Sequence, residues 1–154
     1  EFFSDQAVQM GLPALPVFTP RVDSAQHPLQ FRQGRTLTHF HAFYDHGAAL
    51  PTMRKRRGKP TLWIAPGDAE PRHIDDGDSV RIFNERGEFC ATAFVTPKIE
   101  TGTVWMRDGW AGLNRVTDGN ACLPEGALAT FAFGVGQSLH DAQVDVTRLV
   151  ERTS

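Results

Sequence analysis

The stretch HPLQFRQGRTLTHFH, residues 27–41, decides the fold of this chain. Hydrophobic and polar residues alternate over residues 29–32, which is the period-two pattern of a half-buried β-strand. The alternation resumes over residues 37–43, which places His39 and His41 on the same face of a second strand. We therefore expect two strands joined by a tight turn.

That turn is the segment Gln33-Gly34-Arg35-Thr36. Gly34 has no Cβ, so it can take a positive φ angle or let another molecule approach the backbone closely. Arg35 can bind a phosphate group through two parallel hydrogen bonds. The stretch thus supports two different chemistries: a metal site on the histidines, and a cradle for a large anionic cofactor.

The composition is that of one ordinary domain, with 154 residues of which 40% are hydrophobic. A formal net charge of −2 indicates no nucleic-acid partner. No hydrophobic run approaches the ~20 residues that cross a bilayer, so no membrane span is expected. No secretory leader is visible, which favours a cytoplasmic location, although any leader would lie upstream of Glu1.

The two cysteines, Cys90 and Cys122, stand far apart in the sequence. They form no C-x-x-C pair, which argues against a zinc ribbon, an iron–sulfur site or a dithiol redox motif. We expect both of them to be small buried hydrophobic residues.

Residues 1–26 are predicted to be an extended connector from a preceding domain. Pro13, Pro16 and Pro20 each remove a backbone donor and favour extended geometry in the residue before. Residues 27–150 are predicted to form the domain itself, and residues 151–154 a tail.

Short strands separated by turns make up the rest of the predicted domain. They are expected at residues 61–64, 79–84, 88–95, 103–106, 127–133 and 142–149. Asp68 is expected to cap a short helix that runs to about Ile74. The basic run over residues 53–59 is expected to be a solvated loop, and residues 107–124 an irregular one. This pattern indicates a small all-β barrel or sandwich.

The histidines allow a cupin-like metal-dependent enzyme as one hypothesis. His39 and His41 on one strand face can bind zinc, iron or manganese if His46 or Glu70 supplies a third ligand. Against it, the glutamate usual a few residues after such a pair is missing, and Asp45 has the wrong strand parity. Histidines that contact a ligand without a metal, or that serve structure alone, are the other two interpretations.

Other common motifs offer little chemistry. Asp75, Asp76 and Asp78 lack the spacing of a calcium loop and predict a charged β-turn. Neither GxGxxG nor GxxxxGK[ST] is present, and no serine stands in a nucleophile elbow. A bound dinucleotide would therefore be held in another way.

Several segments, taken in order, resemble the C-terminal dinucleotide-binding domain of the molybdopterin oxidoreductases, which include formate dehydrogenases, nitrate reductases and dimethyl sulfoxide reductase. The segments that carry the resemblance are EFFS (1–4), GLPALP (11–16), HPL (27–29), QGR (33–35), WIAPGDA (63–69), IDDGD (74–78) with Val80, NERG (84–87), residues 99–103, Gly109-Trp110, GLNRVT (112–117) and residues 136–146. Each is weak alone, but their order over most of the chain is specific.

The resemblance implies a mainly β double-psi β-barrel with short helical connections. It implies that the barrel covers one face of a molybdenum or tungsten bis(molybdopterin guanine dinucleotide) cofactor. Contacts to the pterin and phosphates are carried over first to Gly34, Arg35, Thr36 and Asn114. Further candidates are Gln33, His39, His41, Trp110, Thr117 and Gln137.

Each of these residues also has a plain structural interpretation. Arg35 could simply cover a barrel end, Asn114 could be an Asx-turn residue, and Trp110 is better explained by core packing than by stacking on a ligand. The dense basic run over residues 53–59 and the long segment 121–133 depart from the family pattern.

The resemblance also implies which domain of the parent enzyme supplies each functional group. The protein ligand to the metal and the iron–sulfur cysteines come from other domains of the parent oxidoreductase, so this chain is expected to bind cofactor and to supply no catalytic residue and no metal ligand. The parent enzyme acts on a small-molecule substrate, with formate-dehydrogenase-like chemistry slightly favoured. A stand-alone binding or assembly module is a third hypothesis.

Overall fold

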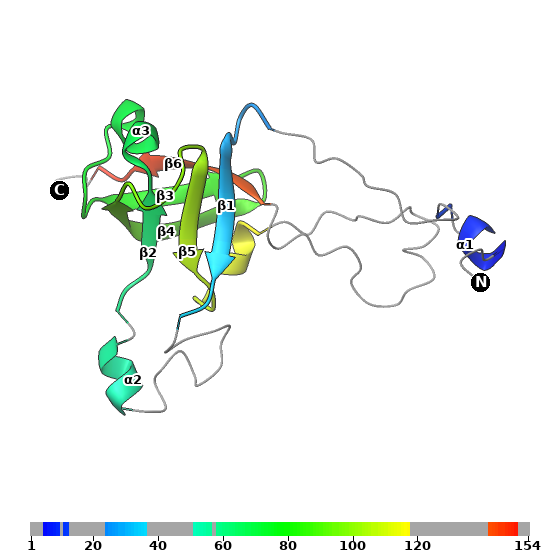
Figure 1. The fold of residues 1–154 in the computed structure, drawn as a ribbon, viewed down its shortest axis with the longest axis horizontal. Coiled ribbons are helices and arrows are strands. Elements are labelled where there is room, and N and C mark those ends of the chain that lie inside the picture. Colours follow the sequence, from blue (N-terminus) through cyan, green and yellow to red (C-terminus); the bar gives the residue numbers. More distant parts are fainter. Residues whose placement is uncertain are drawn as a thin grey trace.

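The computed structural model describes residues 5–9, 11–12, 24–36, 51–56, 58–117 and 142–150. Six strands close into one barrel in the order β1-β5-β2-β4-β3-β6 (Figure 1). Their bounds are β1 Leu29–Gly34, β2 Thr61–Ile64, β3 Ser79–Asn84, β4 Gly87–Val95, β5 Thr103–Arg107 and β6 Gln143–Arg148. β1 with β5 and β2 with β4 are parallel pairs, and the other neighbours are antiparallel. The predicted fold class, a mainly β double-psi β-barrel, is confirmed.

The strand predictions agree closely with the structure where it can be compared. The strand at 61–64 is confirmed, as are the hairpin of β3 with β4, the strand that begins at Thr103 and the one within 142–149. Asn84 pairs with Gly87, so a two-residue turn joins β3 to β4. The strands predicted at 37–43 and 127–133 lie outside the described residues.

Alternation along the strands builds the core. Along each strand every second side chain points inward and is buried. Burying a Val, Leu, Ile, Phe or Met side chain contributes about 1.5–3 kcal/mol. These larger inward residues are Leu29, Phe31, Leu62, Ile64, Val80, Ile82, Val104, Met106, Val144 and Val146, and β4 adds the smaller Ala91 and Ala93.

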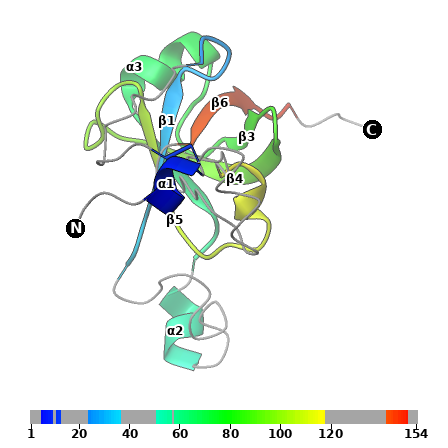
Figure 2. The same cartoon turned by 90° about the vertical axis from the view of Figure 1, so that its right-hand side faces the viewer.

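The described short helices are α1 Asp5–Gln9, which precedes the first strand, and α2 Pro51–Arg56, α3 Pro66–Ala69, η2 Glu70–Arg72 and η3 Leu113–Arg115, which lie between strands. α3 lies at one end of the barrel, and α2 lies beyond the other end (Figures 1 and 2). Two predictions were wrong here. Residues 5–9 are helical where an extended connector was expected, and residues 53–56 of the predicted solvated loop 53–59 belong to the helix α2.

The helix after β2 has a different start from the one predicted. Its N-cap is Ala65 and Pro66 occupies the first turn, so Asp68 is not the cap. Asp68 is instead buried, and its Oδ2 accepts a hydrogen bond of 2.7 Å from the backbone N–H of Gly102. The carboxylate therefore ties α3 to the turn before β5.

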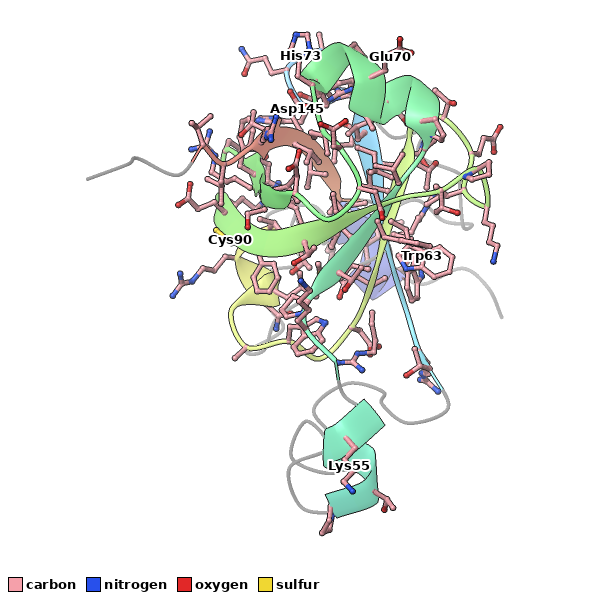
Figure 3. All side chains as sticks on the ribbon, turned by 90° about the vertical axis from the view of Figure 1, so that its left-hand side faces the viewer. Lys55, Trp63, Glu70, His73, Cys90 and Asp145 are labelled. Atoms are coloured by element: carbon pink, nitrogen blue, oxygen red, sulfur yellow. The ribbon has the colours of Figure 1, made fainter. Side chains whose placement is uncertain are left out.

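Two smaller expectations had opposite outcomes. Cys90 is exposed at the barrel surface (Figure 3), which corrects its predicted burial, and Cys122 lies outside the described residues. The predicted turn of aspartates is present. The backbone N–H of Asp75 donates to Asp78 at 2.8 Å, and that of Val95 donates to Asp76 at 2.9 Å. These carboxylates thus stabilise a turn.

In the described part of the chain, no helix is long and apolar enough to cross a membrane.

Replacing Asp68 with alanine is expected to destabilise the barrel by about 1–3 kcal/mol, because the N–H of Gly102 loses its buried acceptor. Urea titration followed by circular dichroism measures this change. Asp75→Ala is the matched control, because that side chain is exposed, and a change within about 0.5 kcal/mol is expected. Equal effects of the two variants would contradict this role of Asp68.

Candidate functional site

The two segments predicted to contact a cofactor leave the barrel at the same end. Gly34 at the end of β1 is paired with Arg107 at the end of β5. The backbone N–H of Asp108 also donates to the carbonyl oxygen of Gly34 at 3.0 Å. We call residues 33–36 and 107–117 the corner. Had they lain at opposite ends of the barrel, a shared ligand surface would have been impossible.

A neighbouring side chain in the same protein leaves no room for a Cβ at position 34, which explains the glycine there. A Cβ at this position would lie 2.5 Å from Nε1 of Trp105, which is too close for any real contact. The positive φ angle considered for Gly34 is wrong, because the described glycines with positive φ are Gly11, Gly58, Gly77, Gly102, Gly109 and Gly112. Close approach of a cofactor to Gly34 stays a prediction, whereas close approach of an indole is observed.

Four of the polar residues predicted to contact the cofactor are accessible. Arg35 and Thr36 are exposed just beyond β1, and Gln33 is half-buried near the end of that strand. Asn114 is exposed within η3. The corner therefore presents a guanidinium, a hydroxyl and two amide side chains to solvent, which are the donors and acceptors that phosphates and pterin edges require.

Thr117 and Trp110 serve the structure of the loop. Thr117 is buried, and its Oγ1 donates to the backbone oxygen of Asn114 at 3.1 Å. Trp110 is 8% exposed and belongs to the hydrophobic core, which confirms the core-packing interpretation. Gly112 makes the turn into η3 with a φ of 88°, a conformation that favours glycine.

Arg107 and Asp108 are corner residues that sequence reasoning missed. Both are more than nine-tenths buried, and the guanidinium carbon of Arg107 lies 4.2 Å from the centroid of the Trp110 ring. This is cation–π geometry, which is worth about 0.5–2 kcal/mol according to its exposure. The available signal was two adjacent charged residues at the end of a short apolar strand.

Asn84 stabilises the 107–117 loop of the corner through hydrogen bonds to backbone oxygens. This buried side chain donates from Nδ2 to the backbone oxygen of Val116 at 2.8 Å and to that of Gln143 at 3.0 Å. Its Oδ1 accepts from the N–H of Arg86 at 3.0 Å. One amide thus ties together the β3–β4 hairpin, β6 and the end of η3. The sequence placed Asn84 at the end of the strand predicted at 79–84 and gave no sign of this role.

Charge favours an anionic ligand at the corner. Its residues include three arginines, Arg35, Arg107 and Arg115, but one carboxylate, Asp108. Arg35 and Arg115 are exposed. Because phosphate oxygens pair well with guanidinium groups, this set of residues fits a ligand that carries phosphates.

Several predicted residues cannot be compared with the structure. His39, His41, His46 and Gln137 lie outside the described residues. Glu70, the alternative third metal ligand, is exposed on η2 beside α3, at the end of the barrel away from the corner (Figure 3). Within the described ranges, no group of three His, Cys, Asp or Glu side chains could hold a metal ion.

Two surface hollows lie away from the corner. One, of about 430 Å³, is lined by residues of α3 and η2 together with Val95 and Arg148. The other, of about 540 Å³, lies around the starts of β1 and β5. Neither is lined by any predicted contact residue, so these hollows carry no argument for the cofactor.

A protein-family model described as the molydopterin dinucleotide binding domain matches residues 29–128. The chain belongs to this family. The match includes both segments of the corner, and it confirms the resemblance that the sequence motifs carried.

Similar proteins agree with this assignment. Dimethyl sulfoxide reductase DmsA of Escherichia coli is 39% identical over 101 residues, which are 62% of this chain and 12% of that protein. The respiratory nitrate reductase subunit alpha of Haloferax mediterranei is 31% identical over 66% of this chain and 10% of its own length. The chain thus spans only about an eighth or less of these relatives.

A solved structure supports the fold. Acetylene hydratase from Pelobacter acetylenicus superposes with a TM-score of 0.73 over 96% of this chain and 23% of its own. At 14% sequence identity this likeness concerns the fold alone.

Removing the amide of Asn84 is expected to destabilise the protein. Asn84→Leu leaves the buried backbone oxygen of Val116 without its donor, at a cost of about 1–3 kcal/mol, and removes the partly buried hydrogen bond to Gln143 as well. The loss is measured by urea unfolding, and hydrogen exchange should show faster exchange in residues 113–117. The control is Glu88→Leu, because Glu88 is exposed on the same hairpin. Unchanged exchange in the loop would refute this role.

Gly34→Ala is expected to destabilise the barrel by about 1–3 kcal/mol, because the new methyl group collides with the indole of Trp105. In a Trp105→Phe background the colliding nitrogen is gone, so the same substitution should cost less. A double-mutant cycle of unfolding free energies measures the coupling. Strict additivity of the two substitutions would show that this contact does not determine the choice of glycine.

Proposed function

We propose that this chain binds a molybdenum or tungsten bis(molybdopterin guanine dinucleotide) cofactor as one domain of a larger oxidoreductase. The observation that carries the proposal is the meeting of the Gln33–Thr36 segment with the 107–117 loop, at the end where β1 and β5 stop side by side. Family membership supplies the ligand class, and the excess of arginine at the corner supports it.

The residues of the corner divide the work of binding. On this proposal Arg35 and Arg115, which are exposed, pair with phosphate oxygens, and the amides of Gln33 and Asn114 pair with ring donors and acceptors. The bound cofactor supplies the redox chemistry, while this chain binds and orients it. Of the described residues, we assign none a catalytic role.

A larger enzyme is part of the proposal. The relatives named above are a dimethyl sulfoxide reductase and a nitrate reductase, and this chain matches 12% and 10% of their lengths. The other domains of such an enzyme are its expected partners. Formate-dehydrogenase-like specificity and a cytoplasmic location stay predictions, and neither of these two relatives supports the first.

Arg35→Ala in the full-length enzyme is expected to weaken cofactor retention by about 1.5–3 kcal/mol, through loss of a charge-assisted phosphate bond. Metal and guanine-nucleotide content after gel filtration measures retention. Arg35→Lys keeps the positive charge but lacks the planar guanidinium group, so its cofactor content should lie between that of the unsubstituted enzyme and that of Arg35→Ala. Arg81→Ala is the control, since Arg81 lies on β3 and pairs with Glu88 at 3.2 Å.

Two results would count against this function. Unchanged metal and nucleotide content in Arg35→Ala would remove Arg35 from the binding surface. Absence of pterin guanine nucleotide from the unsubstituted enzyme, purified from a host that makes the cofactor, would refute the function as a whole.

A further inference from the structure

Three aromatic side chains form a row across the outside of the barrel. Trp63 of β2 is paired with Phe94 of β4 on one side and with Trp105 of β5 on the other. The ring centroids are 5.3 Å and 5.2 Å apart, with edge-to-face geometry in both contacts. Arg32 of β1 is paired with Trp105 and extends the row to a fourth strand. We call these four residues the aromatic row.

The row lies on the outer face, which the core does not use. Its members lie at the outward positions of their strands, and each of them is only partly buried. Figure 3 shows Trp63 pointing away from the barrel. A small barrel that faced water here would be expected to carry polar residues, as one-sided sheets usually do.

The neighbouring outward positions are polar. Thr61 and Thr92 form a pair on one side of the row, and Gln30 and Thr103 form a pair on the other. An apolar centre rich in tryptophan, phenylalanine and arginine with a polar rim is the composition of a protein–protein interface. The pattern therefore indicates a surface that another protein surface covers.

We infer that the aromatic row docks against the body of the parent oxidoreductase, and this inference rests on the proposed function. The parent is favoured over a second copy of the chain for two reasons. The relatives extend far beyond the length matched here, which leaves a large protein surface to be accommodated. The row also continues into the corner, since Trp105 packs against Gly34.

The location of the aromatic row indicates what a docked protein surface would do. Arg32 and Trp105 stand two residues before Gly34 and Arg107 on their strands, so the row borders the corner. A protein surface seated on the row would lie next to the cofactor edge and shield it from water. Interfaces between domains bury about 600–1,500 Å², so the row forms the centre of the contact and the threonine rim completes it.

Site-specific photo-crosslinking in the full-length holoenzyme tests the inference. The photoreactive amino acid p-benzoyl-phenylalanine replaces Trp63 in one variant and Phe94 in a second, which covers the case in which the first does not fold. The control position is Cys90, which is exposed on β4, four residues before Phe94. After irradiation, mass spectrometry identifies the crosslinked peptides, and metal and guanine-nucleotide content are measured in the same preparation.

Crosslinks from position 63 or 94 to parts of the same polypeptide outside this domain are expected, at a yield several-fold above that from position 90. Equal yields, or crosslinks only to a second copy of the enzyme, would overturn the inference. If the cofactor is present while the crosslinks are absent, the docking fails and the proposed function stands. If the unsubstituted enzyme holds no cofactor, it is the proposed function that fails.

Discussion

The parallel pairing of β1 with β5 is the constraint on which the rest of the site depends. Two parallel strands end at the same edge of a sheet, so the chain leaves both of them at the same end of the barrel. An antiparallel pairing would have sent the Gln33–Thr36 segment and the 107–117 loop to opposite ends. Parallel pairing requires a long crossover, and the segment between β1 and β5 contains β2, the hairpin and α3. The same crossover therefore supplies half of the barrel and brings the corner together.

Residues outside the corner give it a defined shape. Asn84 reaches it from the β3–β4 hairpin and donates to the backbone oxygen of Val116, while Trp105 packs against Gly34 from the outer face. These groups are the supporting layer that a ligand surface needs, because a surface already in its bound shape loses less conformational entropy on binding. On the proposed function, positioning and ligand contact are therefore separate tasks, carried by different parts of the sequence.

Local patterns predicted the strands well, since alternation is a short-range property. The inward places of Val80, Ile82, Val104 and Met106 follow from parity alone. The roles of Asn84 and Asp68 could not be predicted in this way. Each joins residues far apart in the sequence: 32 positions separate Asn84 from Val116, and 34 separate Asp68 from Gly102. Only the closed barrel brings such partners within hydrogen-bonding distance.

Gly34 shows how the structural reason for a residue can differ from the reason that the sequence suggests. Its missing Cβ was interpreted as room for a ligand, yet the room is taken by an indole on the outer face. Trp105 thereby contacts Gly34 on one side and Trp63 on the other, so one side chain joins the corner to the aromatic row. A surface that covers the row would restrict the rotamers of Trp105, and it would restrict the backbone at Gly34 by the same contact. On the docking that we infer, assembly of the parent enzyme and preorganisation of the cofactor surface are therefore parts of one packing event.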